Sequence, residues 1–404
     1  MRKAPALSIA SGTLLTILFC STGCTKGNQS QEQAPVVKPV ITSIYPASAG
    51  GGDTVTAHGK NLPTDVSGIH ISVNNKAAKI ITATQDSIQA VVPQLAGSGK
   101  VMLSVGAETY EGPLFEYEYQ AIVTTIAGDG SATNTNGQVA YVSFNCPWGI
   151  AADPDDNLFI ADCYARLIHK ISVADHNVYT YTIPTYVDSA NFYSPYNLAV
   201  DRVTRNVYVT DFNEHLMRMD PAGNMKVIYT AEMPLTGIAV SPDGNNLFVS
   251  NNTKGTITKM DIDGANATTF SQGLITPRNI LFNDQGKMLV AAYPGPVYEI
   301  ASNGSVTAAV NALPDFQGWE FATDTLGNFF LADHFSNCIR IIDKNGNASI
   351  IAGSGAPEDK DGIGLEASFN GPMGITIDSK GNLYVTTYNY DTRGGNNVRK
   401  IELR

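Results

Sequence analysis

A short pattern repeats along the C-terminal two thirds of the chain. It reads GIAADPDDNLFIADCY at 149–164 and GITIDSKGNLYVTTYNY at 374–390, and weaker copies lie between these two. The copies begin about 40 to 54 residues apart, at Pro147, Pro195, Leu235, Pro277, Gly318 and Pro372. A period of this length indicates one supersecondary unit stacked on its neighbours, because a single unit cannot bury its apolar face alone.

Each copy predicts four strands. Two apolar runs flank an Asp/Gly/Asn turn such as DSKGN at 378–382, a third run follows, and a fourth completes the unit, as SIIAG does at 349–353. Turn residues between apolar runs are typical of hairpins. Six four-stranded units repeated radially predict a six-bladed β-propeller over 122–404.

The last copy lacks a fourth run before Arg404. The run VTTIAG at 123–128 precedes the first copy and resembles SIIAG at 349–353. We expect it to pair with the last blade, because that pairing closes the ring and removes strand edges that would promote aggregation.

The first 24 residues predict an export signal. Arg2 and Lys3 precede an apolar run at 7–19 that is too short to span a bilayer, and STGC follows at 21–24. This arrangement is similar to a lipoprotein signal peptide ending at Cys24, the residue expected to carry the lipid. The polar residues up to 38 then predict a flexible tether, 25–38. A plain secretory signal cleaved nearby is the alternative.

The charge balance narrows the range of partners. The chain has 26 Lys and Arg against 37 Asp and Glu, a net charge of −11, and it has no basic run. Nucleic acids and anionic membrane surfaces both attract clustered Lys and Arg, so neither is expected as the main partner. The many Gly, Pro and Tyr residues favour strands and turns over helices. We therefore expect an all-β protein that contacts a membrane through its lipid alone.

Three cysteines follow Cys24 in the sequence, namely Cys146, Cys163 and Cys338. Their spacing does not indicate a zinc site. Cys146 and Cys163 lie at one end of the first predicted blade. Export permits a disulfide between them if their Cα atoms lie within about 7 Å.

Residues 39–119 predict a small all-β sandwich of their own. Short β-branched runs alternate with Gly clusters in PVITSIYPASAGGGDTVTAHGKNL, and further strand-like runs follow at the spacing typical of sandwiches. The run I-x-P, then G-G-x-x-V-x-A-x-G-x-N-L, a V-V-P strand and a closing F-x-Y resemble an IPT/TIG domain. That resemblance implies an immunoglobulin-like fold that acts as a spacer or an interaction module.

The repeated pattern GIAxDxxGNLYVxDxxxxxIxKI resembles NHL repeats, which build β-propellers. The tandem of a lipidated cysteine, an IPT/TIG domain and six such repeats is similar to exported lipoproteins of Bacteroidota-type polysaccharide-utilisation systems. This resemblance implies an outer-membrane lipoprotein, on the cell surface or the periplasmic face. It would bind a polysaccharide or oligosaccharide in support of an outer-membrane uptake complex.

The main candidate binding site lies on one face of the predicted propeller. Loops that lead into the inner strands and loops that follow the second strands emerge there, around the central channel. Flat aromatic rings stack on the C–H faces of sugars, and Arg278, Asn213, Asn252 and Asn389 can bind hydroxyls. The ligand-binding residues predicted on this face are Trp148, Tyr164, Tyr196, Phe212, Arg278, Tyr293, Trp319, His334, Phe335, Tyr388 and Tyr390. The alternative is that these rings only pack between blades.

An enzyme is the competing interpretation. Asn197, Asn279 and Glu320 are expected to point toward the axis, where oxygen ligands suit Ca²⁺, and some six-bladed lactonases and related hydrolases use a comparable ion. The chain would then be a hydrolase or lyase with a central metal ion. One acid without a partnered base, with only His334 nearby to carry a proton, supports general acid–base catalysis poorly, so we assign no catalytic residue. A protein–protein scaffold is the third interpretation.

Acids also recur at the ends of the second predicted strands. They are Asp162, Asp211 and Asp333. Because Asp side chains accept backbone N–H bonds in turns, we expect these three to be structural. No Ser-His-Asp order, phosphate-binding loop or Cys/His pair accompanies them in the sequence.

Overall fold

The computed structural model describes residues 37–132, 137–184, 192, 194–293, 295–310, 318–344 and 346–404. Within these ranges the regular structure consists of strands and three 3-10 helices, η1 (Val66–Gly68), η2 (Val139–Tyr141) and η3 (Gly364–Glu366). The predicted all-β class is therefore confirmed. The predicted signal peptide, most of the tether and Cys24 lie outside the described residues. In the described ranges, no helix is long and apolar enough to cross a membrane.

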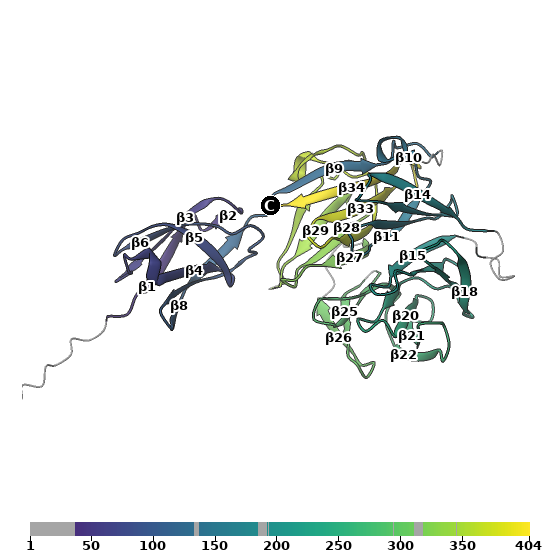
Figure 1. The fold of residues 1–404 in the computed structure, drawn as a ribbon, viewed down its shortest axis with the longest axis horizontal. Helices are drawn as coiled ribbons and strands as arrows, with labels where there is room; N and C mark the ends of the chain where they lie inside the picture. The colour runs from purple at the N-terminus through teal and green to yellow at the C-terminus, as the bar shows by residue number, and fades with distance from the viewer. Residues whose placement is uncertain are drawn as a thin grey trace, which may run out of the picture. The chain divides into compact units, whose positions relative to one another are not determined.

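The first eight strands form a domain around a single core (Figure 1). They are β1 (Val40–Tyr45), β2 (Ser48–Ala49), β3 (Thr54–Lys60), β4 (Ile69–Val73), β5 (Lys76–Ala83), β6 (Ser87–Val91), β7 (Gly99–Val105) and β8 (Glu108–Tyr117). Hydrogen bonds join them in the order β1-β3-β6-β5-β4-β7-β8-β2. Side chains alternate along each strand, so β7 buries Val101 and Leu103 and exposes Lys100. This is the small β domain that the sequence predicts.

The remaining described strands form six separate antiparallel sheets, which are the blades of a propeller (Figure 1). From the inner strand outward the blades are β11 (Pro147–Ala152), β12 (Leu158–Asp162), β13 (Leu167–Ile171), β14 (Asn177–Thr182); β15 (Pro195–Val200), β16 (Val207–Asp211), β17 (His215–Met219), β18 (Met225–Thr230); β19 (Ile238–Val240), β20 (Asn246–Asn251), β21 (Thr256–Asp261), β22 (Thr268–Gln272); β23 (Pro277–Phe282), β24 (Met288–Ala292), β25 (Val297–Ile300), β26 (Val306–Val310); β27 (Gly318–Thr323), β28 (Phe329–Asp333), β29 (Cys338–Ile342), β30 (Ala348–Ala352); and β32 (Pro372–Ile377), β33 (Leu383–Tyr388), β34 (Gly395–Leu403), β9 (Ala121–Ala127). Two short strands, β10 (Gly137–Gln138) and β31 (Gly362–Ile363), extend the first and last sheets.

The Asp/Gly/Asn residues of the repeat build the turn between the first two strands of a blade. Asp378 Oδ1 accepts hydrogen bonds from the backbone N–H groups of Lys380 and Asn382 at 2.9 and 2.8 Å. The Asn382 amide donates to the other carboxylate oxygen at 2.7 Å. Gly381 has φ +85°, a left-handed conformation that suits glycine. The Asp of the repeat pattern therefore stabilises the tight turn that joins the first two strands of a blade. Because this turn recurs in the repeat, the pattern is a good predictor of hairpins.

The acids at the second-strand ends pair with side chains nearby in the same blade. Asp211 accepts from the His215 backbone N–H at 2.8 Å and lies 2.9 Å from His215 Nδ1. Asp162 lies 3.2 Å from His169 Nε2, and Asp333 accepts from Arg340 Nε at 2.7 Å. All three carboxyl groups are buried. These contacts agree with the structural role predicted for them.

The ring closes through β9, as the sequence predicts. This strand precedes the first blade but pairs antiparallel with β34, with Val123 opposite Ile401 and Ala121 opposite Leu403. Figure 1 shows the two strands side by side although they lie at opposite ends of the propeller sequence. β9 therefore supplies the outer strand of the last blade.

A buried arginine secures this closure, and the repeat pattern does not indicate it. The side chain of Arg399 in β34 is fully buried and donates to Asp359 Oδ1 at 2.8 Å and to Asp361 Oδ1 at 2.9 Å. Asp361 Oδ1 also accepts from the backbone N–H of Thr125 in β9 at 2.8 Å. Residues 359 and 361 lie on the segment that follows the fifth blade, so one loop ties both closing strands together.

We expect Asp359→Ala to lower the free energy of unfolding by about 3–5 kcal/mol, because it leaves Arg399 buried beside a weakened counter-charge. The matched control is Glu232→Ala, which removes the exposed partner of Lys254 and should change stability by about 1 kcal/mol or less. Urea unfolding of both variants tests this. Equal effects would contradict the assigned role of Arg399.

Candidate functional site

All eleven predicted ligand-binding residues form one continuous network of contacts on a single face of the propeller. The Trp148 ring centroid lies 4.6 Å from Tyr196, 5.5 Å from Trp319 and 5.7 Å from Tyr390. The remaining members join through further ring contacts and through Arg278. We call this network the aromatic platform; its members are Trp148, Tyr164, Tyr196, Phe212, Arg278, Tyr293, Trp319, His334, Phe335, Tyr388 and Tyr390. The repeat places equivalent positions of different blades beside one another, and the sequence therefore predicts that these residues lie on the same face.

The platform has a buried layer and an exposed layer. Its buried rings are those of Trp148, Tyr196, His334 and Tyr388. Its most exposed rings are those of Tyr164, Phe212, Phe335 and Tyr390. The sequence does not separate the two layers, because burial depends on packing across blades. The buried rings support the exposed ones, which are the ones available to a ligand.

Both tryptophans lie inside strands, although the sequence places the candidate site on loops that lead into the inner strands and loops that follow the second strands. Trp148 is the second residue of β11 and Trp319 the second residue of β27. Each strand begins one residue earlier because Pro147 pairs with Asp162 and Gly318 pairs with Asp333 across the blade. Trp148 is only 7% exposed, so its truncation would damage packing as well as any binding surface.

Arg278 occupies the centre of the platform. Its guanidinium carbon lies 4.2 Å from the Trp319 ring centroid and 5.3 Å from that of Tyr293, and these two rings stack at 5.1 Å. Its Nη1 donates to the Tyr196 hydroxyl at 3.0 Å. Cation–π stacking of this kind holds a guanidinium in place and leaves the N–H groups at its edge able to donate hydrogen bonds to a ligand.

Of the amides predicted beside the platform, Asn389 is already engaged. Its Oδ1 accepts from the backbone N–H groups of Asp391 and Thr392 at 3.0 and 3.1 Å. Asn252 Oδ1 accepts from the hydroxyl of Thr253 at 3.2 Å, and Asn213 is exposed. Asn213 is therefore the amide best placed to reach a ligand.

One residue deeper along the inner strands, a ring of small and polar side chains lies around the axis. Glu320 is buried, accepts from Asn197 Nδ2 at 2.8 Å and lies 3.4 Å from the backbone nitrogen of Ile375. Burial raises the pKa of Glu320 well above its usual value. A Cβ at Gly374 would lie 2.4 Å from the Trp148 carbonyl oxygen, so glycine is required there.

These residues do not fit the calcium site considered from sequence. Ca²⁺ takes six to eight oxygen ligands, whereas this ring offers one carboxyl group and two amides. Asn197 turns its amide nitrogen toward Glu320, which places a donor where a shared cation needs an acceptor. Among the described residues, no group of three or more His, Cys, Asp or Glu side chains could hold a metal ion.

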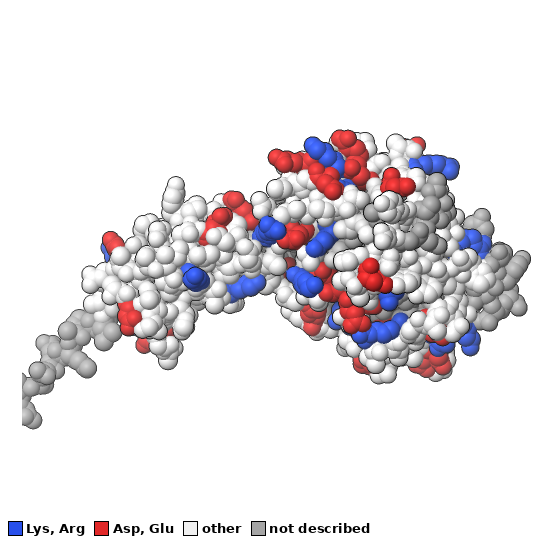
Figure 2. Space-filling model, turned by 45° about the horizontal axis from the view of Figure 1, so that its top comes forward, with Lys and Arg blue, Asp and Glu red and all other residues white. Residues whose placement is uncertain are grey.

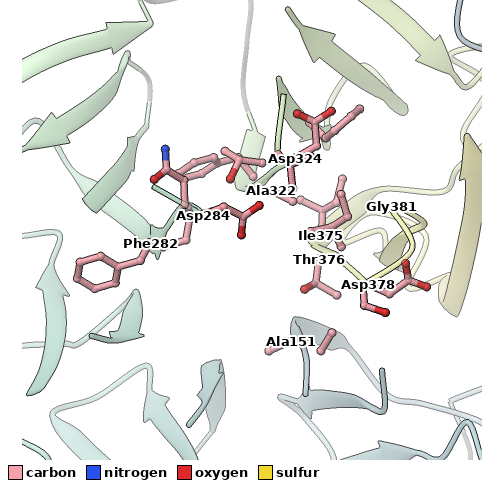
Figure 3. A pocket seen from close by; sticks show the side chains of 18 of the residues that line it. Ala151, Phe282, Asp284, Ala322, Asp324, Ile375, Thr376, Asp378 and Gly381 are labelled. Carbon is pink, nitrogen blue, oxygen red and sulfur yellow. The ribbon is translucent and has the colours of Figure 1, made fainter. Parts of the chain in front are cut away.

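A cavity lies at the other end of the inner strands, away from the aromatic platform (Figure 3). It has a volume of about 1200 Å³ and reaches Asn197 and Asn279 of the polar ring. Figure 3 shows small side chains such as Ala151, Ala322 and Thr376 around its open centre. The sequence does not indicate this cavity, because many of the residues in its walls are small ones such as Ala151 and Ala322, which have no recognisable binding pattern.

The cavity offers little for stacking on a sugar. Among the aromatic residues that line it, Phe321 and Phe330 are buried, and Figure 3 shows Phe282 pointing away from the centre. Acids at its mouth, such as Asp324 and Asp378, are engaged in the repeat turns. The aromatic platform is therefore the stronger candidate site.

Cys146 and Cys163 lie beneath the platform as neighbours. The Cys163 backbone N–H donates to the Cys146 carbonyl oxygen at 3.0 Å, and both residues are buried. The three cysteines in the described ranges, these two and Cys338, are free thiols. Burial raises the pKa of Cys146, and it raises that of Cys338 to about 11.

Comparisons with protein-family models match three parts of the chain. An IPT/TIG domain matches residues 39–117, an NHL repeat matches 144–171, and a model described as lactonase, 7-bladed beta-propeller, matches 198–294. The described residues form six blades rather than seven. A comparison with curated protein sequences gives no match. The chain thus carries an IPT/TIG domain followed by a six-bladed propeller with an NHL-type repeat.

Solved structures share this architecture. A structural genomics protein of unknown function from Bacteroides thetaiotaomicron is 20% identical, with a TM-score of 0.63 over 92% of this chain and 99% of the other. An auxiliary nutrient binding protein from the same species is 17% identical, with a TM-score of 0.57 over 91% and 98%. Another from Bacteroides ovatus is 19% identical, with a TM-score of 0.56 over 92% and 99%. At these identities the likeness shows the fold.

We expect Glu320→Gln to be at least as stable as the wild type at pH 8. The raised pKa means that the folded protein keeps a proton that the unfolded chain releases above its ordinary pKa of 4.5. The free energy of unfolding of the wild type should therefore fall as pH rises from about 5, and that of the glutamine variant should fall less. Urea unfolding at several pH values measures this. A variant less stable at every pH would indicate that Glu320 is ionised in the folded protein.

A thiol count tests the cysteine environment. Protein lacking its first 24 residues should react slowly with a disulfide reagent when folded, because its three thiols are buried and hard to reach. In urea, three thiols should titrate. A count of one would instead show that Cys146 and Cys163 had formed a disulfide.

Proposed function

We propose that this protein is a non-catalytic binding protein that holds a glycan on the aromatic platform, in support of polysaccharide capture or uptake. The observation that carries the proposal is the exposed layer of rings around Arg278, because rings stack on sugar C–H faces while polar groups at their edges bind hydroxyls. The auxiliary nutrient binding proteins that share its fold are consistent with such a role.

The arrangement of polar groups favours binding over catalysis. Glu320, the only acid of the axial ring, is buried and bonded to an amide rather than to a base. Burial lowers the pKa of His334, so it is a neutral imidazole at pH 7. A hydrolase or lyase needs a paired acid and base, or a metal-bound nucleophile, and the axial ring supplies neither arrangement. A protein–protein scaffold would use the same exposed rings, so the binding experiment below decides between these two roles.

We further propose that the protein is lipid-anchored at the outer membrane, on the cell surface or the periplasmic face. The support is the sequence pattern that ends at Cys24. A glycan-binding face tethered beside an uptake complex would raise the local concentration of polysaccharide near the membrane.

We expect Trp319→Ala and Phe335→Ala each to weaken glycan binding by about 1–3 kcal/mol, the range for removing an aromatic anchor. Trp319 is half-buried and carries the Arg278 stack, whereas Phe335 is 58% exposed. Calorimetry with a glycan identified by array screening measures the loss.

The matched control is Tyr179→Ala, which removes an exposed ring from the outer strand β14, away from the platform. It should bind as the wild type does. Full affinity in both platform variants, or an equal loss in the control, would contradict the proposed site.

A further inference from the structure

Arg278 carries a positive charge that no carboxylate neutralises among the described residues. Three other arginines of the propeller, Arg205, Arg340 and Arg399, each pair with an aspartate. The only hydrogen bond described for the Arg278 guanidinium goes to the Tyr196 hydroxyl. Acidic and basic side chains are interspersed on the face drawn in Figure 2, whereas Arg278 is half-buried between two aromatic rings.

Burial shifts the pKa values of the ionisable groups around Arg278 in the direction that favours their uncharged forms. Burial raises the pKa of Tyr196, so its hydroxyl keeps its proton. Burial likewise raises the pKa of Glu320, next to Trp319 in sequence, well above its usual value. His334, which contacts Trp319, has a pKa lowered by burial and is neutral. Arg278 therefore lies among groups whose uncharged forms are favoured by burial.

Unpartnered polar atoms accompany this charge. Arg278 Nε, Trp319 Nε1 and His334 Nδ1 are buried and lack hydrogen-bond partners in the described structure. The first two are donors in every protonation state. Because buried donors without partners are costly, a ligand that brings acceptor oxygens to this point gains more than one that brings only C–H groups.

We propose that the platform selects acidic saccharides, and that Arg278 is the residue that recognises their carboxylate or sulfate group. This inference rests on the proposed glycan-binding function and names the class of glycan. A guanidinium held flat against aromatic rings can offer a pair of N–H groups to an anionic group, and such charge-assisted pairs are stronger than bonds to neutral hydroxyls. The exposed rings would meanwhile stack on neighbouring sugar units.

The test compares charged and neutral forms of the same polymer. Polygalacturonate is paired with its carboxyl-reduced form, and dextran sulfate with dextran, in calorimetry or affinity electrophoresis of the full ectodomain. We expect at least one charged polymer to bind tenfold or more tighter than its neutral partner. This preference should shrink as salt is added, because salt screens exposed charges. The pair that shows the preference distinguishes a carboxylate from a sulfate ligand.

Variants then assign the preference to Arg278. Arg278→Gln should lose about tenfold or more in affinity for the charged polymer and little for the neutral one. The affinity of Arg278→Lys for the charged polymer should lie between those of the wild type and Arg278→Gln, because lysine keeps the charge but not the planar pair of donors. The matched control is Arg202→Gln, which removes one exposed charge from a turn at the opposite end of an inner strand. Melting curves confirm that each variant is folded.

The outcomes separate the inference from the function on which it rests. Equal or tighter binding of the neutral polymers, or an equal loss in Arg202→Gln, overturns the role of Arg278. Neutral saccharides that bind in a Trp319-dependent manner would still support the proposed glycan function. If no saccharide in an array of acidic and neutral glycans binds, both the inference and the proposed function fail.

Discussion

The closed ring is the constraint on which the binding face depends. The ring centroids of Trp148 in the first blade and Tyr390 in the last lie 5.7 Å apart, across the junction that the pairing of β9 with β34 closes. The closure also fixes the tryptophan directly, since Thr386 of the last blade donates to the Trp148 carbonyl oxygen at 2.6 Å. An open ring would leave strand edges exposed and would separate the two halves of the platform. Stability and binding are therefore linked through the same strand pairing.

Residues at the same point of each repeat copy take equivalent positions in successive blades. For this reason the sequence predicts both the blades and the aromatic platform. Once each turn is recognised, residues at the same point of each copy must lie on the same face of the propeller. Tyr196 and Arg278 are 82 residues apart in the sequence, yet the repeat predicts that they lie on the same face. Interactions outside the repeat could not be found in this way. Arg399 finds its acidic partners in a segment that follows no repeat pattern, and the bond from Asn197 to Glu320 depends on how two blades approach each other. Which rings are buried also depends on that approach.

The two ends of the channel differ in chemistry, and the difference explains why one is the proposed site. On one side the inner strands begin with large rings and an arginine without a carboxylate partner. On the other side they end in small residues and in turns where acids such as Asp378 accept hydrogen bonds. Between them lies the ring of Glu320, Asn197 and Asn279, in which Asn197 donates a hydrogen bond to Glu320. The aromatic side of the channel therefore offers a firm surface on which a ligand can rest.

The most direct measurement uses the two tryptophans, since both belong to the platform. Titration of the ectodomain with a glycan whose binding has been established independently should change the intrinsic tryptophan emission, with a midpoint equal to the calorimetric dissociation constant. Trp319→Phe should remove most of that change. Binding by calorimetry without any change in emission would place the ligand elsewhere on the protein and contradict the account.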